Sequence, residues 1–375
     1  MKICGVTAEY NPFHKGHAYH IAKAKELSGA DALIVVMSGH FVQRGEPAIT
    51  DPYKRAEAAL RSGADAVFMM PPEASTSSAE GFAEYAVRLM SQLGCDCISC
   101  GIEPGQPVEK LLETGALLAN ETEELSLKIK SSMKTGISYP EALARAAGIE
   151  TLGPNSLLAV EYVKALRRTG SSMEFVPVRR EGSAYSDEML RDGEFPSATA
   201  LRKAILHGEK TDDGPMDMSD PDSRCLCLGP DDFLPEIINS IQRSDDLCEY
   251  LDVDGAIASR LNRSGFYYHT FEEMVKDIKT KEYTYTRIAR ALIHILLEIR
   301  EAPGKPELAQ LIGFAGQEVM SELKKRSETE ISGKAADHHD QLESSAKAAA
   351  IYNQVFWKKY QIELPNFYRQ NIIKI

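Results

Sequence analysis

The chain has 375 residues, of which 43% are hydrophobic and 26% charged, and its formal net charge is −12 at pH 7. The length allows two domains with buried cores, and the charge argues against general coating of nucleic acid while leaving room for a local basic patch. No run approaches the roughly 18 apolar residues that a membrane span needs, and no signal-peptide pattern is present, so we expect a cytoplasmic protein without membrane association.

The first two hundred residues alternate apolar runs with helical patterns. This alternation predicts parallel βαβ units, and hence a doubly wound, Rossmann-like α/β sheet. The run 32–37 (ALIVVM) has no polar alternation, as expected of a strand that is buried on both faces. In chain order, the predicted strands are 3–7, 32–37, 66–70, 97–101 and 173–177, and the predicted helices are 17–28, 52–63, 80–93, 155–168 and 197–207.

The second half of the chain has a different pattern. A polar segment, 208–224, contains several Asp, Pro and Gly residues and predicts a surface linker. Beyond it the pattern is mainly helical, most clearly at 286–300. We therefore expect a sheet domain over 1–207 and a mainly helical C-terminal domain over 225–375.

Three of the seven cysteines are clustered, at Cys95, Cys97 and Cys100. The odd total and irregular spacing make a poor disulfide framework. The cluster raises the question of a metal, but it lies in an apolar stretch that predicts a buried strand. Zinc usually takes a fourth ligand from a second close pair. We favour a structural role, with a metal site as the alternative.

The most informative motif is the segment 9–17 (EYNPFHKGH), between the first strand and the first helix. Ligands of doubly wound sheets bind at this edge. Gly16 lets the backbone approach a phosphate, and the helix that begins here presents its amides to an anion. His14 and His17 can donate hydrogen bonds to phosphate oxygens and stabilise a departing pyrophosphate. A metal-binding pair or plain solvent-facing histidines are the alternatives.

A second motif, 197–202 (SATALR), opens the last predicted helix of this domain. Ser197 and Thr199 can donate to phosphate, and Arg202 adds a planar cation. A simple N-cap by Ser197 or Thr199 is the alternative, and is common. The pairing with the first motif favours phosphate binding.

Together these motifs resemble the signature of the HIGH nucleotidyltransferase superfamily, whose members catalyse attack on the α-phosphate of ATP. More specifically, the chain resembles the bacterial tRNA(Met) cytidine acetate ligase family. The matching segments run through most of the chain: 9–17, 37–48 (MSGHFVQRGEPA), 153–155 (GPN), 197–202 and 280–287 (TKEYTYTR).

The resemblance implies an enzyme, an ATP-dependent ligase that acts in two steps. Acetate attacks ATP to form acetyl-adenylate, and N4 of the wobble cytidine of elongator tRNA(Met) then takes the acetyl group. ATP is the expected substrate, with Mg²⁺ on the departing pyrophosphate, although no carboxylate stands out as its ligand. No obligate protein partner is evident. The alternatives are a small-molecule nucleotidyltransferase of the cofactor-making type and a nucleotide-binding protein without turnover.

The resemblance also implies which residues form the site. His14, His17 and Arg202 are the expected catalytic residues. Ala200 departs from the family pattern, because a further hydroxyl often occurs there, and its methyl group would remove one phosphate contact. The expected ATP-binding residues are Thr7, Ala8, Glu9, Tyr10, Asn11, Pro12, Phe13, Lys15, Gly16, His20, Gly101, Asn155, either Arg179 or Arg180, Ser197 and Thr199.

For RNA contact, the expected region is the start of the helix predicted near 286. Lys281 and Arg287 can supply affinity for phosphate, and Tyr283 can stack on an unpaired base. Arg44, just after the second strand, can reach a phosphate or the tRNA backbone. Solvated charges at a helix start are the alternative. Cofactor-making enzymes are commonly single compact domains, so a long second domain favours a macromolecular substrate.

Overall fold

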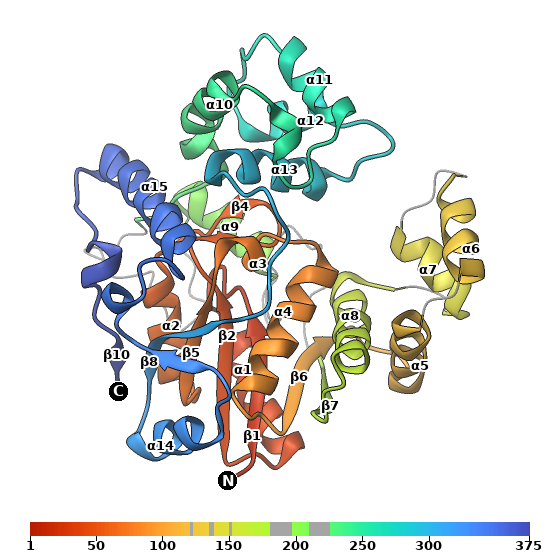
Figure 1. The fold of residues 1–375 in the computed structure, drawn as a ribbon, viewed down its shortest axis with the longest axis vertical. Helices are drawn as coiled ribbons and strands as arrows, with labels where there is room; N and C mark the ends of the chain where they lie inside the picture. The colour runs from red at the N-terminus through yellow and green to blue at the C-terminus, as the bar shows by residue number, and fades with distance from the viewer. Residues whose placement is uncertain (121–122, 135–138, 150–151, 181–196, 210–225) are drawn as a thin grey trace.

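The computed structural model describes residues 1–120, 123–134, 139–149, 152–180, 197–209 and 226–375 (Figure 1). Five parallel strands form the centre of its main sheet, in the order β5-β2-β1-β6-β7. The order reverses between β1 and β6, which is where doubly wound sheets bind their ligands. The strands are β1 (Ile3–Ala8), β2 (Ala32–Ser38), β5 (Ala66–Met70), β6 (Cys97–Ile102) and β7 (Glu174–Arg179).

Helices cover both faces of this sheet. On one face, Ile34 and Val36 of β2 pack with residues of α4 (Ala79–Gln92) and α8 (Pro154–Thr169). On the other, Leu33 and Val35 pack with α1 (Lys15–Ser28) and α2 (Pro52–Arg61). Alternate side chains of an all-apolar strand therefore enter two separate cores. No helix in the described ranges is long and apolar enough to cross a membrane.

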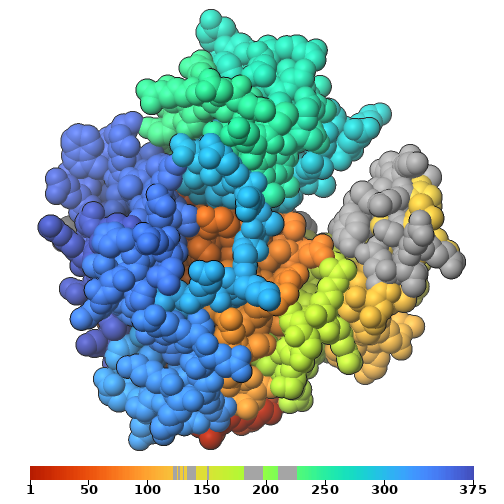
Figure 2. Space-filling model, viewed as in Figure 1, coloured from red at the N-terminus to blue at the C-terminus, as the bar shows by residue number. Residues whose placement is uncertain are grey.

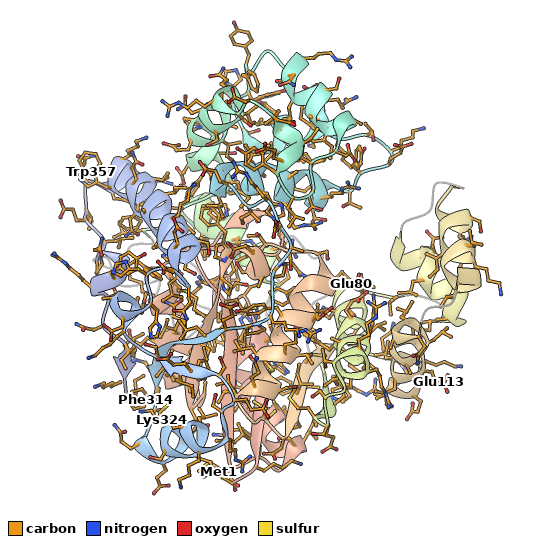
Figure 3. The ribbon with its side chains drawn as sticks, viewed as in Figure 1. Met1, Glu80, Glu113, Phe314, Lys324 and Trp357 are labelled. Atoms are coloured by element: carbon orange, nitrogen blue, oxygen red, sulfur yellow. The ribbon has the colours of Figure 1, made fainter. Side chains whose placement is uncertain are left out.

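Ion pairs fasten α4 to α8. Oε1 of Glu80, a residue labelled in Figure 3, accepts a hydrogen bond from Arg168 at 2.6 Å and lies 2.9 Å from Nζ of the buried Lys164. Beyond α8, three helices form a lateral layer (Figure 1). They are α5 (Val108–Ala119), α6 (Glu123–Lys134) and α7 (Tyr139–Ala147), while α3 (Pro72–Ser75) and α9 (Ala198–Leu206) lie nearer the carboxyl ends of the strands.

Four helices form a unit beyond the carboxyl ends of the strands, and residues of α15 (Glu343–Tyr360) complete its apolar core (Figures 1 and 2). Phe41 of the hairpin β3 (Phe41–Val42) and β4 (Glu46–Pro47) inserts into that core, with its ring 5.5 Å from that of Phe233. The hairpin thus links the helical unit to the sheet. The helices are α10 (Leu234–Arg243), α11 (Gly255–Arg263), α12 (Phe271–Ile278) and α13 (Tyr285–Leu297), with 3-10 turns at 230–233 and 247–249.

The chain then returns to the main sheet, which differs from the predicted division at 208–224. β8 (Leu308–Phe314) pairs antiparallel with β5, and β9 (Glu330–Ser332) and β10 (Ile373–Lys374) pair with β8. The sheet therefore takes strands from both ends of the chain. Except for residues 208 and 209, the predicted linker lies outside the described residues. The remaining elements are α14 (Gln317–Arg326), α15 (Glu343–Tyr360) and short turns at 335–337 and 367–369.

The clustered cysteines belong to a core strand and the turn before it. Cys97 and Cys100 lie on β6, Cys95 precedes it, and all three are buried free thiols. In the described parts of the chain, no three His, Cys, Asp or Glu side chains are grouped so as to hold a metal ion.

Candidate active site

A cavity of about 200 Å³ lies at the carboxyl ends of β1 and β6, next to the point where the strand order reverses. The loop after β1, the hairpin β3–β4 and the beginning of α9 contribute to its walls. The lining residues are Thr7, Ala8, Glu9, Tyr10, Asn11, His14, Gly16, His17, Tyr19, His20, Gln43, Arg44, Phe82, Cys100, Gly101, Asn155, Leu158, Tyr162, Val178, Arg180, Ala198 and Arg202.

The two motif histidines form a stacked pair at the beginning of α1. Their ring centroids lie 3.7 Å apart at an interplanar angle of 26°. The backbone N–H of Gly16 donates to Nδ1 of His14 at 3.1 Å, and the backbone N–H of His14 donates to Nδ1 of His17 at 3.2 Å. Because each Nδ1 accepts a hydrogen bond, the proton of each neutral ring resides on Nε2. Each ring therefore offers one N–H donor from Nε2.

All three histidines of the cavity are neutral at pH 7. Burial, followed by the charges of Arg180 and Arg202, lowers the pKa of His14 to about 3. Burial lowers the pKa of His17 well below its usual value, with contributions from His14 and Arg180. Burial and Arg180 lower the pKa of His20 to about 4. The positive charge of the site thus comes from arginines, and the histidines act as neutral donors.

Arg202 connects the second motif to the first. One guanidinium nitrogen donates to the backbone oxygen of Asn11 at 2.6 Å, and the other to Oγ1 of Thr199 at 3.3 Å. The two motifs, far apart in the sequence, therefore face the same cavity.

The hydroxyls of the second motif are engaged within their own helix. Ser197 caps α9 by accepting the backbone N–H of Ala200 at 3.1 Å, and its side chain is buried. Thr199 supports Arg202. Neither residue lines the cavity, whereas Ala198 does. For Ser197, the geometry is that of the N-cap alternative, because a hydroxyl held in a cap faces its own helix.

The structure distinguishes Arg180 from Arg179. Arg180 lines the cavity, whereas the exposed Arg179 donates to the backbone oxygen of Gln106 at 2.9 Å. A Cβ on Gly101 would lie 3.3 Å from Cγ of Arg180, so glycine leaves room for the arginine beside the strand.

Three residues of the first motif lie outside the cavity lining, namely Pro12, Phe13 and Lys15. Phe13 is buried beneath the loop, with its ring 4.7 Å from that of Tyr10, while Lys15 is exposed on α1. Pro12 follows a cis peptide bond and is buried. These side chains shape or flank the loop and do not reach into the space that it encloses.

Arg55, which sequence reasoning missed, is fully buried below the cavity. It donates to the backbone oxygens of Glu9 at 2.5 Å, Ser38 at 3.1 Å and Thr50 at 3.2 Å, and also to that of Gly39. One guanidinium thus holds together the ends of β1 and β2 and the segment before α2. It forms no ion pair with a described residue, and burial lowers its pKa to about 10, which leaves it charged at pH 7.

The apolar wall of the cavity was also missed. It consists of Phe82 from α4 and Leu158 and Tyr162 from α8. These residues occupy ordinary core-facing positions of amphipathic helices, so no local sequence signal marks them.

The residues expected to contact RNA occupy two places. Arg44 lines the cavity, and the neighbouring Gly45 packs directly on α13, where an added Cβ would lie 2.3 Å from the backbone nitrogen of Arg290. Lys281 is exposed before α13. Tyr283 is only 8% exposed, and its hydroxyl donates to Asp254 at 2.8 Å. The structure therefore does not present Tyr283 as an open stacking surface.

Arg287 packs on that same tyrosine. Its guanidinium carbon lies 4.8 Å from the centroid of the Tyr283 ring, and Nη2 donates to Oδ2 of Asp254 at 3.1 Å. An aspartate thus already offsets part of the positive charge expected to attract RNA.

The cavity thus brings together the two motifs that carry the resemblance to HIGH nucleotidyltransferases. The family model described as HIGH Nucleotidyl Transferase matches residues 1–365. A tRNA(Met) cytidine acetate ligase of Thermoanaerobacter sp. (strain X514) is 36% identical in an alignment 373 positions long that covers 92% of this chain and 92% of its own. Another with this name, from Caldicellulosiruptor saccharolyticus, is 34% identical over 100% of this chain and 99% of its own. The chain belongs to the tRNA(Met) cytidine acetate ligase family of HIGH nucleotidyltransferases.

Solved structures agree with this family. Thermotoga maritima TmcAL in its apo form I superposes with a TM-score of 0.88 at 26% identity, over 100% of both chains. A second crystal form of the Thermotoga protein, bound with alpha-thio ATP, superposes with a TM-score of 0.85 at 25% identity, again over 100% of both chains. The similarity thus includes the helical unit as well as the sheet.

Proposed function

We propose that this chain is an ATP-dependent tRNA(Met) cytidine acetate ligase. It joins acetate to N4 of the wobble cytidine of elongator tRNA(Met) and releases AMP and pyrophosphate. The observation that carries the proposal is the convergence of His14, His17, Arg180 and Arg202 on one cavity at the switch point of the sheet. The names of the relatives and the ATP analogue bound to the Thermotoga protein support the same substrates. A bacterial tRNA substrate also implies a cytoplasmic location.

In the first step, an acetate oxygen attacks the α-phosphorus of ATP. An O–P bond to acetate forms, the bond from phosphorus to the bridging oxygen of pyrophosphate breaks, and acetyl-adenylate results. The demand on the protein is orientation and charge stabilisation, because no protein nucleophile takes part. The Nε2 donors of His14 and His17 and the two arginines offset the charge that grows on pyrophosphate.

In the second step, N4 of cytidine attacks the acetyl carbonyl carbon. A C–N bond forms, the C–O bond to AMP breaks, and N4 loses one proton. The base must reach the cavity from outside, and we assign its approach to the side where the hairpin β3–β4 meets α13. Arg44 lies at that junction, and Lys281 and Arg287 lie near the beginning of α13.

The residues present suit Mg²⁺ that arrives on the triphosphate. Among the described residues lining the cavity, Glu9 is the one carboxylate, and its Oε1 accepts the backbone N–H of Gln43 at 3.0 Å. Mg²⁺ in phosphate-transfer sites is typically held by one or two carboxylates, substrate oxygens and water. When bound, the ion would neutralise phosphate charge, and Glu9 is the side chain placed to hold it.

The test is to incubate the protein with ATP, labelled acetate and elongator tRNA(Met), and to measure label in RNA together with AMP. Label in RNA that depends on ATP supports the proposal. Pyrophosphate release with nicotinamide or pantetheine phosphates, and none with acetate, would assign the chain to the cofactor-making nucleotidyltransferases. ATP binding without any product would assign it to the non-catalytic binders.

A further inference from the structure

The beginning of α8 is held by a carboxylate from the end of the neighbouring strand β6. Oε1 of Glu103 accepts both the backbone N–H and the side-chain Nδ2 of Asn155, each at 2.9 Å. Oε2 accepts the backbone N–H of Ser156 at 2.7 Å and also the hydroxyl of Ser156. Asn155 lines the nucleotide cavity, and Glu103 does not.

This arrangement fixes which end of the Asn155 amide faces the cavity. A carboxylate oxygen only accepts hydrogen bonds, so the amide must turn its NH₂ group toward Glu103. The opposite orientation would place two oxygens against each other. Within the described chain, Oδ1 of Asn155 has no hydrogen-bond donor. The side chain that reaches the cavity therefore offers an acceptor.

We propose that Glu103 is a positioning residue that holds Asn155 as a hydrogen-bond acceptor for a donor group of the nucleoside. This inference rests on the proposed ATP-dependent function. Phosphate oxygens are themselves acceptors, so they are not the partner of this side chain. Two groups of ATP have the required chemistry, the 6-amino group of adenine and the ribose hydroxyls.

The residues around Glu103 leave room for its carboxyl group and stabilise the ionised form. A Cβ on Gly153 would lie 2.5 Å from Cδ of Glu103, so only glycine admits the carboxyl group here. Burial raises the pKa of Glu103, but hydrogen bonds from Ser156 and Asn155 outweigh burial and leave it below its usual value. Glu103 also occupies the amides at the N-terminus of α8, so these do not serve as a phosphate site.

Calorimetric titration of the full chain with ATP tests the positioning role. Glu103→Gln must turn its NH₂ group against the backbone N–H of either Asn155 or Ser156, which displaces the beginning of α8 together with Asn155. ATP binding should therefore weaken about 3- to 10-fold, as for one lost hydrogen bond. Asn155→Ala should show a similar loss, and the double variant should bind no more weakly than Asn155→Ala alone. Ser156→Ala is the matched control, because it removes a donor to Oε2 and leaves the contact with Asn155 intact. Its affinity should stay within about twofold of the wild type.

Three analogues identify the donor: purine riboside triphosphate, which lacks the 6-amino group, 2′-deoxy-ATP and 3′-deoxy-ATP. The analogue without the relevant donor should bind the wild type about 3- to 10-fold more weakly than ATP does, and Asn155→Ala should bind that analogue and ATP equally.

Three outcomes overturn the inference while ATP binding by the wild type keeps the proposed function standing. They are unchanged binding in Glu103→Gln, a loss in Ser156→Ala as large as in Glu103→Gln, and analogue losses that are the same in wild type and Asn155→Ala. Failure of the wild type to bind ATP would instead remove the proposed function, and this inference with it.

Discussion

The guanidinium of Arg202 donates a hydrogen bond to the backbone oxygen of Asn11 at 2.6 Å, across 191 positions of the sequence. Since Asn11 belongs to the loop that carries His14, this bond fixes the loop relative to α9. The same guanidinium lines the cavity, and its charge adds to burial and to Arg180 in lowering the pKa of His14. Arg202 therefore both shapes the histidine loop and supplies positive charge beside it.

Arg202→Ala should reduce acetate-dependent exchange of pyrophosphate into ATP by about 10²- to 10³-fold, the usual effect of losing one charge-stabilising donor. Arg202→Lys keeps the charge but loses the planar pair of donors, so its exchange rate should lie between that of the wild type and that of Arg202→Ala. Arg300→Ala is a suitable control, because Arg300 is 58% exposed and pairs with Glu249 on the surface. Exchange in Arg202→Ala within twofold of the wild type would remove this residue from the first step.

His17 should act through the N–H donor at Nε2, and two substitutions separate this from its accepting role at Nδ1. His17→Ala should lower the exchange rate by at least about a hundredfold. His17→Gln keeps a donor near the position of Nε2, whereas His17→Asn keeps an acceptor near that of Nδ1. The glutamine variant should therefore retain more activity than the asparagine variant. If asparagine were the better replacement, the capping contact with the backbone of His14 would be what matters.

Much of the central sheet and its covering helices could be predicted from short-range pattern. The β-branched run of β2 and the glycine after α1, at φ 62°, are local signals, and the elements occur where those signals place them. β8 was missed although its seven residues are buried and all but Gln310 are apolar, because its partner β5 lies about 240 positions earlier and only tertiary pairing distinguishes such a run from a helix.

The site was less predictable where a choice depended on side-chain direction. Arg179 and Arg180 are neighbours at the end of β7, and successive residues of a strand point to opposite faces. Sequence alone could not decide which one faces the cavity. Arg55 gave the pattern of an ordinary charged helix position, and only the fold shows that four backbone oxygens surround it. Glu103 escaped notice for the same reason.

Buried histidines should make the protein less stable as the pH falls. Burial, with Arg55, lowers the pKa of His40 to about 3 in the folded state, against an ordinary value of 6.5. Between these values the unfolded chain binds a proton that the folded chain does not, so the free energy of unfolding rises with pH in that window. Each such histidine adds about 1.4 kcal/mol per pH unit to the slope of the free energy of unfolding against pH.

Urea unfolding at pH 4 to 8 measures this slope. His40→Asn should reduce the slope by about 1.4 kcal/mol per pH unit between pH 4 and 6. Above pH 7 the variant and the wild type should change with pH in parallel, which serves as the internal control. An unaltered slope below pH 6 would mean that His40 is protonated in the folded protein.

Removal of Arg55 should destabilise the floor of the cavity. Arg55→Met leaves four backbone oxygens without their donor, so the free energy of unfolding should fall by about 3 to 5 kcal/mol. Arg55→Lys should recover only part of the lost free energy of unfolding. The ammonium keeps the charge and can donate to some of the four oxygens, but it cannot reach all of them. Arg61→Met on the same helix is the control: Arg61 is 59% exposed, and its substitution should cost about 0.5 kcal/mol or less. If urea titrations showed equal losses in the free energy of unfolding at positions 55 and 61, the stabilising role of the hydrogen bonds from Arg55 would be contradicted.

The contact between the hairpin β3–β4 and α13 should matter more for transfer to tRNA than for activation of acetate. Gly45 has φ 76°, and a Cβ there would lie 2.3 Å from the backbone nitrogen of Arg290. Gly45→Ala must therefore push the hairpin, with Arg44, away from α13. Gly29→Ala is the matched control, because Gly29 has φ 62° with nothing within 4 Å of the added Cβ in the described structure. Both variants carry the strain of a left-handed alanine, about 1 kcal/mol, but only the first disturbs the junction.

We expect Gly45→Ala to lower the rate of acetyl transfer to tRNA(Met) at least about tenfold, and acetate-dependent pyrophosphate exchange much less, because the histidines and Arg202 stay in place. Gly29→Ala should leave both rates close to those of the wild type. The two rates are measured on the same preparations, so a loss of folded protein would lower them together. Equal losses of transfer and exchange in Gly45→Ala, at an unchanged amount of folded protein, would show that the hairpin serves the nucleotide site alone, and the approach of tRNA would then have to be sought elsewhere on the surface.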